Sequence, residues 1–137
     1  MMIHPNVVKF FCSFEDENFV HIILENCSQK SLLHVLKYRS TITEPETRYY
    51  MKQILLGARY IHKRGFLHRD LKLGNMLLSL DMVVKIGDFG LACVLGDCKP
   101  GSMCGTPNYI APEVHITSNL LSLQYVYLNF LLCVGPR

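Results

Sequence analysis

Several features that would assign a chain to a specialised class are missing here. The 137 residues contain no cluster of Lys and Arg and no compositionally simple stretch, and the formal net charge is only +3. So mild an excess does not favour nucleic acid or a membrane surface as a partner. The N-terminus lacks a charged segment followed by an apolar run, so nothing marks secretion. These absences predict an intracellular location, in the cytoplasm or the nucleus.

The cysteines also lack the spacing of a metal site. The count would allow a disulfide framework, but no two cysteines form a C-x-x-C pair and no His flanks them at zinc spacing. Without a secretion signal we expect reduced thiols that pack as small buried hydrophobes. The six are Cys12, Cys27, Cys93, Cys98, Cys104 and Cys133.

No apolar run is long enough for a membrane span. Residues 120–134 come nearest, but Ser122, Gln124 and Asn129 interrupt them, and the stretch is shorter than a bilayer requires. A core helix, or a tail with no fixed structure, is the expectation there. Apolar residues make up 50% of the chain, which allows a packed core, and the length allows one small domain at most.

What is present begins with two runs rich in β-branched and aromatic residues, at 7–14 and 19–24, around a polar turn at 15–18. This pattern predicts a β-hairpin. A short helix is expected at 31–37. Residues 76–78 and 82–86 resemble two more strands, joined by a turn at 80–81. Residues 87–113 are rich in Gly, Pro, Cys and Ser and predict a long functional or disordered loop.

A longer helix is predicted between these strand pairs. Thr43 with Glu46 forms a capping box, and Pro45 falls in the first turn, where its missing N–H does no harm. Gly65 can end the helix in the left-handed conformation. These limits give a helix of about 20 residues. Its apolar face repeats at helical spacing through Tyr50, Ile54, Ala58 and Ile61.

The clearest motif follows this helix. Residues 68–75 read His-Arg-Asp-Leu-Lys-Leu-Gly-Asn, which matches the protein kinase catalytic loop H-R-D-L-x-x-x-N. Asp-Phe-Gly stands at 88–90, after the predicted strands, and Ala-Pro-Glu stands at 111–113, where the long loop ends. One tripeptide alone is a weak signal, but three motifs in the family's order are specific. The chain therefore resembles a eukaryotic protein kinase.

The resemblance implies ATP and Mg²⁺ as cofactors and assigns chemistry to four residues. Phosphoryl transfer depends on positioning and charge neutralisation. Asp70 would accept or orient the proton of the substrate hydroxyl. Asn75 and Asp88 would supply oxygen ligands to Mg²⁺. Lys72 would reach the transferring phosphate as a point charge. Asp70, Lys72 and Asn75 are thus the expected catalytic residues, and Lys72, Asn75 and Asp88 are expected at the nucleotide.

A structural role is the alternative for each residue taken alone. Asp70 could hold its loop through hydrogen bonds, and Asp88 could cap a turn. Their joint occurrence with Asn75 and Lys72 at the family's spacing favours the catalytic interpretation. His68 is expected to pack beneath the loop rather than to act as a base.

Three further residues concern the activation segment. In the family, an Arg at the position of Arg69 can pair with a phosphate on this segment. The candidate acceptors are Ser102 and Thr106. Ser102 occupies the phosphorylated position of polo-like kinases, which implies an upstream activating kinase, although an ordinary polar loop residue is equally compatible. Thr106 is expected to lie near Asp70 and to shape the substrate site.

The resemblance is strongest to polo-like serine/threonine kinases and spans residues 4–114. It rests on Leu-Lys-Leu-Gly-Asn at 71–75, Thr-Glu-Pro-Glu with Arg-Tyr-Tyr at 43–50, and Cys-Gly-Thr-Pro-Asn-Tyr at 104–109. Glu25 and Cys27 fit the hinge that meets adenine through backbone groups. Leu77 stands where these kinases carry Phe beneath the nucleotide. The implied substrates are Ser and Thr residues of proteins, and the implied fold is α+β, part of the small-lobe sheet with the upper large lobe.

The departures from the family are as informative. No G-x-G-x-x-G loop precedes the hairpin, and the V-A-I-K lysine is absent. The likeness stops after Val114. We therefore expect an incomplete kinase domain at 1–114, lacking the Gly-rich loop and the lower large lobe, and a divergent apolar tail at 115–137. A truncated, catalytically inactive fragment that acts at most as a binding module is the alternative to an active kinase.

Overall fold

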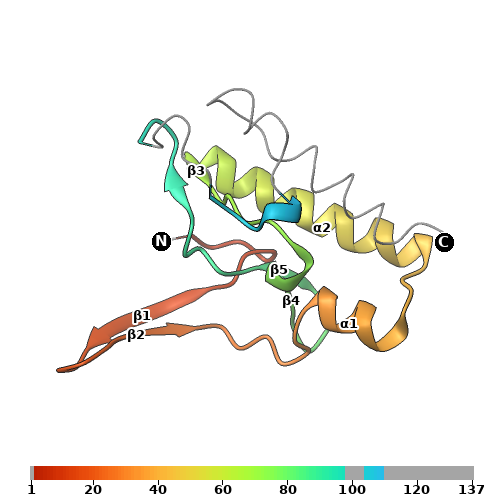
Figure 1. Cartoon of the computed structure of the whole chain (residues 1–137), viewed down its shortest axis with the longest axis horizontal. Coiled ribbons are helices and arrows are strands. Elements are labelled where there is room, and N and C mark those ends of the chain that lie inside the picture. The colour runs from red at the N-terminus through yellow and green to blue at the C-terminus, as the bar shows by residue number, and fades with distance from the viewer. Residues whose placement is uncertain (1, 98–103, 110–137) are drawn as a thin grey trace.

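The computed structural model describes residues 2–97 and 104–109. It shows a mixed α+β arrangement in which a two-stranded hairpin projects from a body of two helices and short strand pairs (Figure 1). Ser102, the Ala-Pro-Glu motif and the predicted tail lie outside the described residues. Within those residues no helix combines the length and apolarity that crossing a membrane requires. The predicted fold class is confirmed.

The projecting hairpin pairs β1 (Phe10–Glu15) with β2 (Val20–Leu24) in antiparallel register. Asp16 shapes its turn, since its Oδ1 accepts the amides of Asn18 and Phe19 at 2.9 Å. The predicted hairpin is confirmed, but its apolar side chains are exposed on both faces. They are Phe10, Phe11, Phe14, Phe19, Val20, Ile22, Ile23 and Leu24.

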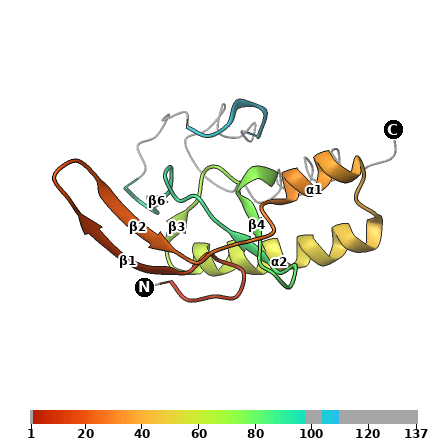
Figure 2. The ribbon, with the colours of Figure 1, turned by 90° about the horizontal axis from the view of Figure 1, so that it is seen from below.

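The body contains two helices, which lie on either side of β4 (Met76–Leu78) (Figure 2). The shorter helix, α1 (Leu32–Arg39), leads into the longer α2 (Glu44–Lys63). The capping box of α2 is present, with the Thr43 amide donating to Glu46 at 2.9 Å. The same carboxylate receives a bidentate contact from Arg39, at 2.6 and 3.2 Å. Gly65 follows the helix with φ +78°, in the left-handed conformation that was predicted.

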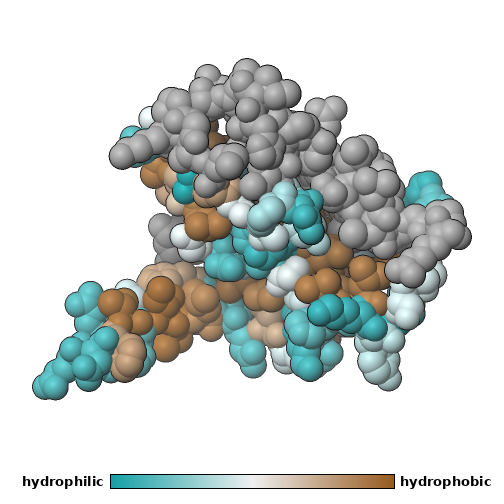
Figure 3. Space-filling model, in the orientation of Figure 1, coloured by the Kyte–Doolittle hydropathy of each residue, from teal (hydrophilic) through white to brown (hydrophobic). Residues whose placement is uncertain are grey.

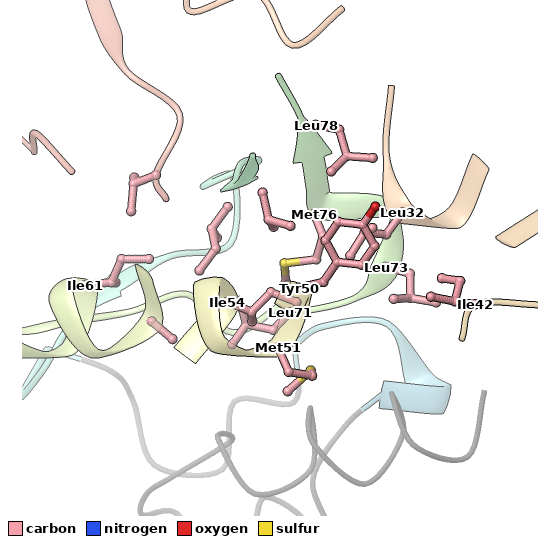
Figure 4. Close-up of a cluster of buried hydrophobic side chains, with 14 residues drawn as sticks. Leu32, Ile42, Tyr50, Met51, Ile54, Ile61, Leu71, Leu73, Met76 and Leu78 are labelled. Carbon is pink, nitrogen blue, oxygen red and sulfur yellow. The ribbon is translucent and has the colours of Figure 1, made fainter. Parts of the chain in front are cut away.

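The core lies between α2 and a short antiparallel pair, β4 (Met76–Leu78) with β5 (Val84–Ile86). All four residues of the predicted apolar face of α2 are buried. They meet side chains from α1, β4 and the loop before β4 in one cluster (Figure 4). Its buried members are Val7, Leu32, Ile42, Tyr50, Met51, Ile54, Ala58, Ile61, Leu71, Leu73, Met76, Leu78, Val84 and Ile86. This packing holds the loop between α2 and β4 in place.

The segment before the hairpin is fastened to the same core. Asn6 donates its side-chain amide to the Val84 carbonyl at 2.9 Å and to the Gln53 side chain at 3.2 Å. Its own carbonyl accepts the Ile86 amide at 3.0 Å. Gly57 on α2 lets this segment approach closely, because a Cβ there would lie 2.6 Å from the Asn6 carbonyl oxygen.

Local details differ from the predictions. Strand β5 begins at Val84 rather than Met82, because Met82 has φ +59° and belongs to a turn that starts at Ser79. The predicted long loop contains β6 (Cys93–Val94), which pairs with β3 (Phe66–Leu67), and the short 3-10 helix η2 (Pro107–Tyr109). A second 3-10 turn, η1 (Leu73–Asn75), lies before β4.

The cysteines follow the prediction only in part. Cys12, Cys27 and Cys104 are free thiols, but Cys12 is exposed rather than buried. Cys93 is disulfide-bonded, so the prediction of six reduced thiols is wrong at this position.

Candidate active site

The loop between β3 and β4 is built around a buried histidine. His68 is 2% exposed, and its Nε2 lies 2.9 Å from the Gly87 carbonyl oxygen. Its Nδ1 accepts the Asp70 amide at 3.3 Å, so one ring nitrogen donates and the other accepts, as in a neutral imidazole. Burial is the main influence on His68 and lowers its pKa. Together with its ring contact to Phe89, this gives His68 a structural position beneath the loop.

Asp70 is the centre of a hydrogen-bonded cluster. Its Oδ2 lies 2.6 Å from the Lys72 Nζ and accepts the Asn75 Nδ2 at 3.0 Å. Its Oδ1 accepts both the amide and the hydroxyl of Thr106, at 3.1 and 2.7 Å. Burial alone would raise the pKa of Asp70, but the contacts with Lys72, Thr106 and Asn75 outweigh it and hold that pKa below its usual range. Asp70 is therefore a fixed, ionised carboxylate.

Lys72 joins the catalytic loop to the segment at 104–109. Its Nζ contacts Asp70 and also donates to the Thr106 Oγ1 at 2.8 Å. The Lys72 side chain is 28% exposed, so its charge is still within reach of a ligand from solvent. Thr106, which is distant in the sequence, thus meets the predicted site residues Asp70 and Lys72 in one place.

Asn75 connects this cluster to the Asp-Phe-Gly motif. Its Nδ2 donates to the carbonyl of Asp70 at 2.9 Å as well as to the carboxylate. Its own carbonyl accepts the Gly87 amide at 2.9 Å, which extends the β4–β5 pairing by one position and brings Asp88 to the same end of the strands. The charges of Asp70 and Asp88 both act to raise the pKa of His68, against the larger effect of its burial.

Asp88 itself has an uncommon backbone conformation. Its φ is +61°, in the left-handed region, and its Oδ1 accepts the Gly90 amide at 3.3 Å. The side chain is exposed. An amide oxygen at Asn75 and a carboxylate at Asp88, at adjacent strand ends, are the hard oxygen ligands that Mg²⁺ accepts. The residues present therefore fit a magnesium site.

Arg69 is tied to the segment after Asp88. Its φ is +64°, and its Nε donates to the Leu91 carbonyl at 2.6 Å. The predicted partner Ser102 lies outside the described residues, so the pairing of Arg69 with a phosphate there stays a prediction. Thr106 lies against Asp70, where it was expected.

The predicted hinge residues lie at the base of the hairpin. Glu25 donates its amide to the Lys9 carbonyl at 2.8 Å, and the Cys27 carbonyl accepts the Lys30 amide at 3.3 Å. The Glu25 carboxylate binds Lys85 at 2.9 Å, a residue that the sequence did not single out. Its signal was a lone charge within the apolar run of β5. Leu77 lies on β4, opposite Lys85. It packs against Gly87, where an added Cβ would lie only 2.9 Å from the Leu77 Cδ1 atom.

Comparison with known proteins identifies the family. Residues 1–124 match the family model described as the protein kinase domain, so the chain belongs to that family. Within the family it is most like the polo-like serine/threonine kinases, which confirms the resemblance.

Three relatives illustrate the match. The chain is 54% identical over 114 residues to serine/threonine-protein kinase PLK1 of Xenopus tropicalis, which covers 81% of this chain and 19% of the relative. It is 50% identical over 113 residues to PLK2 of Mus musculus, with 81% and 17% covered. It is 54% identical over 112 residues to plk-1 of Caenorhabditis elegans, with 81% and 17% covered. The chain thus spans less than a fifth of the length of these relatives.

Proposed function

We propose that this chain carries the centre for ATP-dependent phosphoryl transfer to Ser and Thr residues of proteins. The observation that carries the proposal is the buried Asp70 carboxylate, held at once by Lys72, Asn75 and Thr106. Phosphoryl transfer requires little covalent chemistry from the protein and depends on fixed charges and positions. A carboxylate oriented by three neighbours meets that requirement.

Each residue then has a distinct role. Asp70 orients the substrate hydroxyl and accepts its proton. Lys72, which already bridges Asp70 and Thr106, stabilises charge on the transferring phosphate. Asn75 and Asp88 would hold Mg²⁺, and the bound ion would neutralise charge on the phosphates of ATP. Thr106, bonded to both Asp70 and Lys72, helps to shape the site for a Ser or Thr hydroxyl.

The adenine site is proposed at the base of the hairpin. Among the described residues, the Glu25 amide and the Cys27 carbonyl are used in internal hydrogen bonds. The Glu25 carbonyl and the Cys27 amide are therefore the backbone groups proposed to meet adenine. Leu77, on the strand that follows Asn75, is proposed to lie beneath the base.

Regulation and location are part of the same proposal. A phosphate placed on Ser102 by an upstream kinase would pair with Arg69, a charge-assisted contact that would order the activation segment. A reaction that consumes ATP fits an intracellular location, in the cytoplasm or the nucleus. The kinase domain is proposed at 1–114, with the divergent tail at 115–137.

An inactive fragment that binds other proteins is the second candidate. The observation that favours it is the apolar surface of the hairpin, where Phe19 is 68% exposed and Val20 is 62% exposed. Exposed apolar surface of this kind marks interaction sites.

Nucleotide binding separates the two candidates. The full chain would be titrated with Mg²⁺-ATP beside Asp88→Asn, with Asp81→Asn in the exposed β4–β5 turn as the matched control. The kinase proposal predicts binding that Asp88→Asn weakens at least about tenfold and Asp81→Asn leaves unchanged. No binding by any of the three chains would support the inactive fragment. Transfer of labelled phosphate to a Ser/Thr peptide, abolished in Asp70→Asn, would then establish activity.

A further inference from the structure

One ion pair outside the catalytic cluster is largely shielded from solvent. The Lys85 Nζ lies 2.9 Å from the Glu25 Oε1, and the two side chains are 12% and 28% exposed. The pair between Arg48 and Glu44 on α2, by contrast, has side chains 79% and 75% exposed. Exposed pairs of that kind contribute little, whereas a shielded pair with further hydrogen bonds constrains the geometry around it.

The shielded pair has those further bonds. Lys85 also donates to the Pro5 carbonyl at 3.0 Å, in the segment that precedes the hairpin. The second oxygen of Glu25 accepts the Lys9 amide at 3.1 Å. The pair therefore joins β5, the segment before β1 and the chain directly after β2.

These contacts lie where the hairpin meets the body. The hairpin projects away from α1 and α2 in both views of the ribbon (Figures 1 and 2), with polar residues at its tip and apolar ones nearer its base (Figure 3). Every residue of β1 is exposed, as is every residue of β2 except His21. Packing of strand side chains therefore does little to fix its direction, and the contacts at its base must do so.

The Lys85 side of the pair is connected through β5 to the proposed metal site. Lys85 lies on β5, the strand that leads directly into Asp88, and Glu25 begins the proposed adenine hinge. The pair thus bridges the adenine side and the phosphate side of the proposed nucleotide site.

We propose that Lys85 is a positioning residue for the nucleotide. Through Glu25 it holds the hinge at 25–27 at a fixed distance from β5, and so sets the spacing between the adenine-binding backbone and Asp88. Lys85 acts through Glu25 and contacts no reacting atom. The effect on nucleotide binding rests on the proposed function. The contact of Lys85 with Glu25 that joins the hinge to β5, which we call the latch, is a property of the chain alone.

Hydrogen exchange of the full chain tests the latch without nucleotide. Lys85→Met removes the ammonium and keeps the stem, Lys85→Arg restores the charge, and Arg48→Met is the matched loss of an exposed ion pair. In Lys85→Met we expect the Glu25 amide to exchange about tenfold faster, while amides of Ile54 and Ile61 in α2 stay unchanged. Lys85→Arg and Arg48→Met should resemble the wild type.

Two results would overturn the latch. One is unchanged exchange at Glu25 in Lys85→Met, and the other is an equal rise throughout α2, which would mean general destabilisation. If Lys85→Met does not fold, Glu25→Gln keeps the shape and the acceptor for Lys9 but removes the charge, and the same prediction applies to it.

Nucleotide affinity tests the positioning role. With Mg²⁺-ATP we expect the dissociation constant to rise about tenfold in Lys85→Met and to recover in Lys85→Arg. Equal affinity of the wild type and Lys85→Met would refute the role even if exchange at Glu25 increased. A wild-type chain that binds no nucleotide refutes the positioning role together with the proposed function, while the exchange experiment still decides the latch.

Discussion

The hairpin and the catalytic loop at 68–75 are held in opposite ways. The hairpin strands are exposed almost throughout and depend on a few contacts at their base. Asp70 and Asn75 in the catalytic loop are only 6% and 7% exposed, and they are bonded to each other and to groups far along the chain. The residues assigned to chemistry are thus fixed by hydrogen bonds to distant parts of the chain, whereas the hairpin strands are fixed at one end only.

The largest difference in stability should appear when an isoleucine is truncated in the core and, for comparison, in the hairpin. Ile54 is 1% exposed in the core, and Ile22 is 60% exposed on the hairpin. We expect Ile54→Ala to lower the free energy of unfolding by about 3 kcal/mol, and Ile22→Ala by less than about 0.5 kcal/mol. Urea unfolding measures both. Equal losses would mean that the hairpin is packed in solution and that the contrast is wrong.

A slightly smaller loss of stability is expected at Gly57, where the N-terminal segment crosses α2. The methyl group of Gly57→Ala would lie 2.6 Å from the Asn6 backbone oxygen, which cannot move away without breaking its bond to Ile86. Overpacking of this kind costs about 1–3 kcal/mol. Thermal unfolding of Gly57→Ala beside Gly74→Ala, whose added Cβ would meet nothing closer than 3.9 Å, measures the difference. Equal melting temperatures would contradict the close approach.

A change at Thr106 would show how firmly the catalytic cluster is joined to the activation segment. Thr106→Val keeps the shape but removes the hydroxyl that donates to Asp70 at 2.7 Å and accepts from Lys72 at 2.8 Å. We expect a loss of about 1 kcal/mol of stability. The pKa of Asp70 should also rise toward its ordinary value, since Thr106 is one of the groups that lower it. Carboxyl titration by NMR measures the shift, and an unchanged Asp70 would place Thr106 away from it.

The smallest effect concerns the capping box of α2. Hydrogen bonds from Arg39 and Thr43 lower the pKa of Glu46 from 4.5 to about 2. Because the folded-state pKa is the lower one, the stabilisation is complete above about pH 4.5 and is lost as the pH falls toward 2. Exposure keeps it below about 1 kcal/mol.

Glu46→Gln should therefore flatten the dependence of unfolding free energy on pH between about 5 and 2. Glu44→Gln, in the same helical turn, controls for the loss of a charge near the helix N-terminus. A wild-type slope in Glu46→Gln would show that the bonds from Arg39 and Thr43 do not form in solution.

Sequence patterns predicted individual helices and strands better than the contacts between them. The limits of α2 could be predicted because Thr43, Glu46 and Gly65 act on neighbouring backbone groups. The contact of Asp70 with Thr106 was expected only from the resemblance to protein kinases, since nothing local joins two residues so far apart.

The connections that were missed depend on the folded arrangement. The pair of Lys85 with Glu25 forms only once β5 and the end of β2 are brought together. The pairing of β6 with β3 joins two-residue strands that are too short to show a period. The exposure of the hairpin was also hidden, because its strands are apolar on both faces and such a pattern predicts burial.

The central claim is that Asp70, Asn75 and Asp88 converge on one nucleotide phosphate, and paramagnetic relaxation tests it directly. Mn²⁺-ATP would be added to the labelled full chain, and broadening of the amide resonances would be followed. The account predicts that Asp70, Asn75 and Asp88 broaden first and that Glu17 at the hairpin tip stays sharp, with the effect lost in Asp88→Asn. Broadening at Asp88 without Asn75 or Asp70, or no selective broadening at all, would contradict a shared site.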